Sequence, residues 1–226
     1  NPDSGAISRF PTPTPALKDP HTLVFNPQGD IWFTAQMGNA LGLLNVTTGA
    51  LQQFAVPTPR ARPYGIKVDA AGRPWAALLG THKLATLAAG QRIEEVTLPR
   101  ASARPRRLEI TADGRVWYLD YAEGMLGRYD PKDRSFIEWS MPGGKDSKPY
   151  GTALDREERL WIAETGQRPN RLIGFDTRLE RFISATDLPS GGSIRHMVYH
   201  PPSDAFWFGV DTGYIGRAAL KKPAAE

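Results

Sequence analysis

His21 and His196 are the side chains of this sequence best suited to acid–base chemistry, because imidazole titrates near neutral pH. Asp19 lies two residues before His21. Two imidazoles and a carboxylate could transfer protons, or they could help to hold Mg²⁺, which prefers oxygen ligands. The sequence contains no cysteine, so disulfides, thiolate nucleophiles and thiolate metal sites are excluded. Whether the three groups meet depends on the elements that carry them.

Tryptophan marks a repeat along the whole chain. Five of the six tryptophans are separated by 43, 42, 44 and 46 residues, and only Trp139 falls outside the series. A period of this length is typical of a β-propeller, in which each repeat forms one four-stranded blade. The five markers are Trp32, Trp75, Trp117, Trp161 and Trp207.

Each repeat reads as four short strands. An alternating strand and a polar turn precede the tryptophan strand, a third strand carries an apolar residue before a small one, and a fourth ends near proline. We therefore expect an all-β propeller of about five blades in one domain over residues 1–226. The predicted blades are 21–61, 62–103, 104–147, 148–192 and 193–220, with residues 4–12 as the last strand.

The N-terminal strand is assigned from its alignment with the fourth strand of the repeat. Ser4–Pro11 matches the fourth-strand segment around Gly49 and Phe54, whereas the fifth repeat lacks a fourth strand after Leu220. We expect the N-terminal strand to complete the last blade and close the ring, which would hide two sheet edges. An open fragment of a larger ring is the alternative.

The residue that begins the first strand of each blade should lie at the mouth of the central channel. We call this the mouth position, and we count it 11 residues before each tryptophan. In a closed five-blade ring the first and fifth blades touch, so His21 and His196 become neighbours. The exit position lies three residues after each tryptophan. The predicted mouth positions are His21, Tyr64, Arg106, Tyr150 and His196, and the exit positions are Ala35, Leu78, Asp120, Glu164 and Val210.

Charge and hydrophobicity limit the classes of partner that this sequence predicts. The net charge is +4, yet the densest basic stretch, 100–107, has neither zinc-ligand spacing nor an aromatic RNA-binding motif, so we expect no nucleic-acid partner. No apolar run is long enough for a membrane span. His82 and His200 fall in loops or at strand ends and are expected to be structural or solvated. Oligomeric state stays open.

The repeats resemble those of the virginiamycin B lyase (streptogramin lyase) family. The likeness rests on Pro-Tyr-Gly at 63–65 and 149–151, Gly-Asp-Ile-Trp-Phe-Thr at 29–34, and Leu-Gly-Arg and Ile-Gly-Arg at 126–128 and 215–217. It covers residues 3 to 220. The resemblance implies a propeller that opens streptogramin B antibiotics, and so confers antibiotic resistance, by Mg²⁺-assisted elimination.

The resemblance also implies roles for residues. His21 would be the general base and His196 a second catalytic imidazole, with Asp19 as a metal-site carboxylate. Tyr64 would contact substrate, and we expect Arg106 and Tyr150 to share that role at the mouth. Glu164 and Asp120 keep exit-position carboxylates on other blades and are weaker metal candidates. Ala35 stands where the family has a second Glu, which should weaken Mg²⁺ binding.

Two other functions remain open. The first is a non-catalytic propeller that binds or senses a small molecule or cyclic peptide at the channel mouth. The second is a propeller lactonase, which ranks lowest because the mouth and exit positions do not supply the Glu, Asn and Asp cluster that Ca²⁺ would need. By association with exported propellers, a periplasmic or extracellular location is favoured over a cytoplasmic one.

Overall fold

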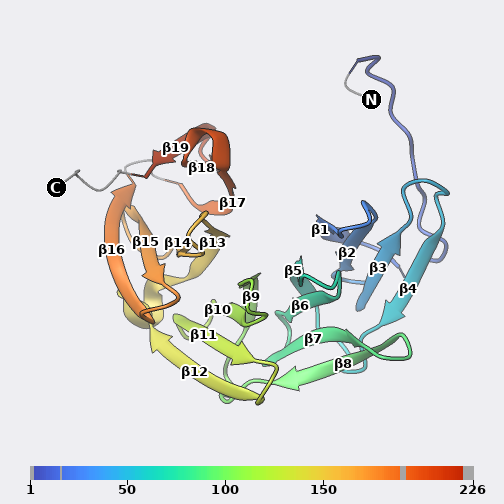
Figure 1. The fold of residues 1–226 in the computed structure, drawn as a ribbon, viewed down its shortest axis with the longest axis horizontal. Helices are drawn as coiled ribbons and strands as arrows, with labels where there is room; N and C mark the ends of the chain where they lie inside the picture. The colour runs from blue at the N-terminus through green and yellow to red at the C-terminus, as the bar shows by residue number, and fades with distance from the viewer. Residues whose placement is uncertain (1–2, 16, 189–191, 221–226) are drawn as a thin grey trace.

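The protein forms five antiparallel sheets arranged in an arc around a common axis (Figure 1). The computed structural model describes residues 3–15, 17–188 and 192–220. Four of the sheets have four strands, the fifth has three, and each comes from one consecutive stretch of chain. The five-blade propeller expected from the tryptophan period is therefore confirmed. The described residues contain no helix with the length and apolar character needed to cross a bilayer.

Neighbouring strands of each blade are joined by hairpins and run outward from the axis in chain order. Blade 1 contains β1 (Pro20–Phe25), β2 (Ile31–Ala35), β3 (Ala40–Leu44) and β4 (Leu51–Ala55). Blade 2 contains β5 (Pro63–Val68), β6 (Pro74–Leu78), β7 (Lys83–Ala88) and β8 (Arg92–Thr97). Blade 3 contains β9 (Pro105–Ile110), β10 (Val116–Asp120), β11 (Met125–Asp130) and β12 (Ser135–Ser140).

A short 3₁₀ turn precedes blade 4, and another lies within blade 5. Blade 4 follows η1 (Gly144–Ser147) and contains β13 (Pro149–Leu154), β14 (Leu160–Glu164), β15 (Asn170–Asp176) and β16 (Arg181–Leu188). Blade 5 contains β17 (Ile194–His200), η2 (Pro201–Ser203), β18 (Ala205–Val210) and β19 (Tyr214–Ala219).

The marker tryptophans form the core between successive blades. Each of the first four joins a cluster with residues of the next blade, so Trp75 shares a cluster with Tyr118 and Trp117 shares one with Ile162. Trp139, the tryptophan outside the period, stacks on Trp117 with ring centroids 5.8 Å apart. Trp207 has no following blade and is 38% exposed, whereas Trp117 is 1% exposed. Burial of the repeat's largest side chain thus depends on the presence of a neighbouring blade.

The expected closure by the N-terminal strand is wrong for this structure. β19 is the edge of a three-stranded sheet, and residues 5–12 form no strand. The segment instead packs beside blade 1, where Phe10 lies against the turn at Gly49 and Thr14 donates a hydrogen bond to Gln53. Figure 1 shows it leaving β1–β4 on the side away from β19. Prolines at 11, 13 and 15 supply no N–H donors, which disfavours a continuous ladder there.

Candidate functional site

The innermost strand of every blade has a bulge at the same place. In the first four blades the strand begins with proline, which pairs with the exit residue of the next strand before the register shifts. β17 follows the same rule, with Ile194 in place of proline and paired with Val210. The bulge re-aims the side chains that follow it. Successive innermost strands contact one another around the axis, so these side chains gather at one end of it.

This register corrects the position of His196. The residue opposite the marker tryptophan lies eight positions before it in the first four blades, but Val198 lies nine before Trp207. The β17–β18 hairpin holds one extra residue, in the turn that contains η2. Arg195 therefore occupies the mouth position of blade 5, and His196 occupies the next one. The observed mouth positions are His21, Tyr64, Arg106, Tyr150 and Arg195, and the positions after them are Thr22, Gly65, Arg107, Gly151 and His196.

Arg106 lies among three tyrosine rings. Its guanidinium carbon is 3.9 Å from the ring centroid of Tyr150, 4.3 Å from that of Tyr121 and 4.9 Å from that of Tyr64. It also donates a hydrogen bond of 3.2 Å to the Tyr64 hydroxyl, which in turn is hydrogen-bonded to the Tyr150 hydroxyl. The structure thus brings together the three predicted substrate-binding residues. It adds Tyr121, which sequence reasoning missed although it directly follows the exit residue Asp120.

The two phenols differ in acidity because they play different parts in this network. Burial raises the pKa of Tyr64, but hydrogen bonds from Tyr150 and Arg106 outweigh it, so the net pKa is below the usual value. Burial raises the pKa of Tyr150, and its hydrogen bond to Tyr64 raises it further. The Tyr64 oxygen thus accepts a hydrogen bond from Arg106 at the centre of the cluster.

Arg107 lies across the axis between the two ends of the arc. Its guanidinium donates to the Thr22 hydroxyl of blade 1 at 3.2 Å and to the Arg195 carbonyl of blade 5 at 3.4 Å. Gly65 leaves room for it, because a Cβ there would lie 2.9 Å from the Cα of Arg107. Sequence reasoning assigned no role to Arg107. The sequence feature that could have indicated the position of Arg107 is the pair of Pro-Tyr-Gly motifs, because a glycine there allows another chain segment to approach closely.

The ring of His21 is oriented by two neighbours. Its Nδ1 is 2.8 Å from the Thr22 hydroxyl, which also accepts the Arg107 hydrogen bond, and its ring lies 4.0 Å from the Tyr64 ring, centroid to centroid. Burial and then Arg107 lower the pKa of His21, and the same two causes lower the pKa of His196. Within the described residues no hydrogen bond joins the two imidazoles. Arg107 is their common neighbour.

The exit-position carboxylates hold loops rather than line the mouth. Asp120 is fully buried and accepts hydrogen bonds from Arg100 and from the backbone N–H groups of Arg104, Ala122 and Glu123. Glu164 is also fully buried, and it binds Arg171 and the Gly143 N–H.

The predicted Mg²⁺ site stays a prediction, and the donor set at the mouth does not fit it. Within 3–15, 17–188 and 192–220, no three His, Asp or Glu side chains gather as metal ligands. Asp19 is exposed beside His21, but Ala35 is fully buried and the nearest charged groups are guanidinium ions. A divalent cation would meet positive charge and one carboxylate.

Glu109 lines a narrow cavity of about 70 Å³ at the axis, together with Arg107 and His196. It is 5% exposed, it pairs with Lys67 at 2.9 Å, and its Oε1 has no hydrogen-bond partner among the described residues. Burial raises the pKa of Glu109, and Lys67 and Arg107 offset this only in part. The folded protein therefore binds this proton more tightly than the unfolded chain does.

Glu109→Gln is accordingly expected to raise the free energy of unfolding at about pH 8, where the unfolded chain has lost the Glu109 proton, and to lose that advantage below about pH 4. The sign follows because a raised folded-state pKa leaves stability intact below the unfolded-state pKa and lowers it as the pH rises towards the folded-state pKa, and glutamine has no such dependence. Urea unfolding at several pH values measures it, with Glu94→Gln, on an exposed residue without an ion pair, as the control. Destabilisation at pH 8 would mean that the Lys67 ion pair outweighs burial.

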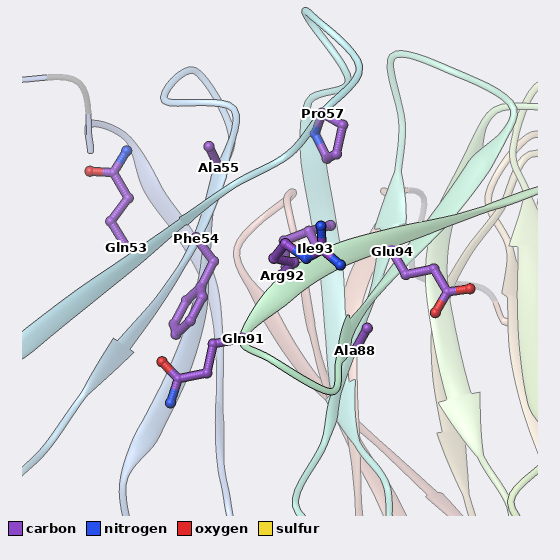
Figure 2. Close-up of a pocket in the computed structure, with 9 residues that line it drawn as sticks. All are labelled: Gln53, Phe54, Ala55, Pro57, Ala88, Gln91, Arg92, Ile93 and Glu94. Carbon is purple, nitrogen blue, oxygen red and sulfur yellow. The ribbon is translucent and has the colours of Figure 1, made fainter.

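Two recesses of different chemistry adjoin the ring. A cavity of about 250 Å³ beside His21 is lined mainly by apolar side chains, among them Phe10, Leu23, Phe33 and Leu51. Another, of about 620 Å³, lies at the outer rim between β4 and β8, where Figure 2 shows Phe54 and Ile93 among glutamine and charged side chains. The rim recess contains no histidine. The mouth and the apolar cavity together therefore form the candidate site.

Solved structures with the same fold include a streptogramin B lyase and a virginiamycin B lyase. A streptogramin B lyase shares 23% identity over 97% of this chain and 74% of its own, with a TM-score of 0.79. A selenomethionine-substituted virginiamycin B lyase from Staphylococcus aureus shares 20% identity over 99% of this chain and 76% of its own, with a TM-score of 0.80. A putative 6-phosphogluconolactonase from Bacteroides fragilis shares 13% identity over 89% and 66%, with a TM-score of 0.69.

These likenesses, all below 25% identity, establish a streptogramin-lyase-like propeller fold. No protein-family model matches the chain, and no curated protein matches it.

Proposed function

We propose that this propeller binds a cyclic ester, such as a depsipeptide or lactone, at the channel mouth and opens it by elimination with His21 as the general base. The observation that carries the proposal is the position of His21. Its Nδ1 side is held by Thr22, its ring lies against Tyr64, and the side chain is exposed to an incoming ligand. In the proposed tautomer the Nδ1–H of His21 donates to the Thr22 hydroxyl, which leaves Nε2 unprotonated and able to accept a substrate proton.

The elimination needs one proton acceptor and no water. The Nε2 of His21 takes the proton from the carbon α to a carbonyl, a C=C bond forms between the α and β carbons, and the β-carbon–oxygen bond breaks. The bonding electrons stay on the ester oxygen, which leaves as a carboxylate. Negative charge thus develops on the carbonyl oxygen next to the α carbon and on the leaving ester group, and a positively charged mouth stabilises both. No divalent cation is assigned to this step, because the mouth lacks a fitting donor set.

The apolar cavity beside His21 suits the body of such a substrate. Its walls are largely hydrocarbon and aromatic, and the polar mouth begins at His21 and Thr22. Ligand sites of this kind combine apolar burial with a few convergent polar groups. The lyase-like structures described above add that the same fold occurs in enzymes named for streptogramin substrates.

Mass spectrometry tests the proposal directly. The protein is incubated with a streptogramin B depsipeptide, with Mg²⁺ or with EDTA. The expected product is linear, has the same mass as the substrate and absorbs as an α,β-unsaturated amide. A product one water heavier would indicate hydrolysis and contradict the base-promoted step. No conversion at high protein concentration would also contradict it for this substrate class.

A non-catalytic binding propeller is the second candidate. It is favoured by the packing of Arg106 against Tyr64, Tyr121 and Tyr150, which is an arrangement for gripping a ligand rather than for moving a proton. In that case the depsipeptide would protect the protein against thermal unfolding without being converted.

A further inference from the structure

We propose that Arg106 and Arg107 form a carboxylate-binding site at the channel mouth, which supplies from the protein itself the positive charge that a bound cation would otherwise provide. The inference goes beyond the proposed elimination, because a carboxylate would bind here whether or not His21 transfers a proton.

The charges of the two arginines are compensated only in part, by tyrosine rings and, for Arg107, by a longer-range attraction to Glu109. Among the described residues neither guanidinium has a carboxylate within ion-pair distance, whereas Arg195, the third arginine of the mouth, is paired with Asp211 at 3.1 Å. Adjacent residues of β9 thus hold two positive charges close together. Such a pair is favourable only where another group balances it, and aromatic faces balance it in part.

Each guanidinium also keeps donors in reserve. Arg106 donates to Tyr64, and Arg107 donates to Thr22 and to the Arg195 carbonyl. A guanidinium has five N–H groups, so both ions retain N–H groups without an acceptor in the described protein. Both side chains are partly exposed, so a ligand can reach them. A planar carboxylate matches the guanidinium fork better than a point charge does.

The site is held rigid before any ligand binds. Three tyrosine rings fix Arg106, and contacts to blades 1 and 5 fix Arg107. Gly65 opens the space that Arg107 fills. Such pre-organisation reduces the entropy lost when an anion binds. It also places the positive charge beside His21, whose proposed reaction releases a carboxylate.

Benzoate and its neutral analogue benzamide test the site. Isothermal titration is carried out with the whole protein in EDTA, so that metal-mediated binding is removed. We expect benzoate to bind at least about tenfold more tightly than benzamide, because hydrogen bonds to charged groups contribute about 1.5–3 kcal/mol. Equal affinity for the two compounds, or no saturable benzoate binding, would overturn the proposal.

Variants locate the binding. Arg106→Gln and Arg107→Gln are each expected to weaken benzoate binding about tenfold, and Arg106→Lys less, because it keeps charge but loses the planar fork. Arg156→Gln, at an exposed turn with bonds to Tyr199 and Pro201, removes the same charge elsewhere and should leave affinity unchanged. If Arg107→Gln fails to fold, Arg106→Gln decides. Unchanged affinity in Arg106→Gln would refute the site.

Benzoate binding and depsipeptide conversion are separate readouts. If the protein binds benzoate through these arginines but forms no elimination product, the carboxylate site is supported and the proposed enzyme activity is refuted. If the protein converts depsipeptide but Arg106→Gln binds benzoate normally, the enzyme activity is supported and the carboxylate site is refuted.

Discussion

His21→Ala is expected to lower kcat for depsipeptide opening by about 10²- to 10⁴-fold, the usual contribution of a positioned general base. The loss should fall mainly on kcat, because Arg106, Tyr64 and the apolar cavity remain to bind substrate. His21→Gln should be as inactive, since an amide of similar reach cannot accept the proton. Steady-state kinetics with the linear product as readout measure both variants.

His200→Ala is the matched control for that experiment. His200 contacts Ser203 in the turn at the end of β17, and it lies outside the mouth, so its removal should leave kcat unchanged. His196→Ala should have an intermediate effect. His196 lines the cavity of about 70 Å³ at the axis together with Thr22 and Arg107, and it lies one position after the mouth position that an 11-residue count assigns to it. An active His21→Ala protein would remove the basis for the elimination.

Trp117→Ala is expected to lower the free energy of unfolding by about 3–5 kcal/mol, the range for deletion of a large buried aromatic side chain. Trp117 stacks on Trp139, lies 5.6 Å from Phe175 by ring centroids, and donates its Nε1 hydrogen to Thr111 at 3.1 Å. The variant leaves a cavity between blades 3 and 4 that rigid sheets cannot close. Urea unfolding followed by circular dichroism measures the loss.

Trp207→Ala provides the comparison, because it deletes the same side chain from the same place in the repeat. Trp207 is 38% exposed and has no following blade to pack against, so we expect a loss of no more than about a third as much. Similar losses at the two positions would show that the blade interface does not set the stability of the repeat. Neither residue touches the mouth, so the comparison is independent of function.

Much of the fold could be predicted because local pattern and tertiary packing agree in a repeat. Each tryptophan marks a strand, and each blade buries its own tryptophan against the next, so the period alone implies five stacked sheets. The order of His21, Tyr64, Arg106 and Tyr150 followed from the same phase. Prediction failed where one repeat departs from the pattern: the longer β17–β18 hairpin moves Arg195 to the mouth, and the proline-rich N-terminal segment does not join blade 5.

The sequence by itself determined the blade repeat and, for the first four blades, which residue occupies the mouth position of each innermost strand, because strand spacing and turn chemistry are local. Only the tertiary structure decided how those residues combine. Arg107 reaches across the axis to Thr22 and to the carbonyl of Arg195, more than 80 residues away along the chain in each direction. Asp120 is held by Arg100 from the loop before β9, Glu164 is held by Arg171 of β15, and Ala35 is buried. The balance of charge at the mouth depends on these distant partners, and no local spacing encodes them.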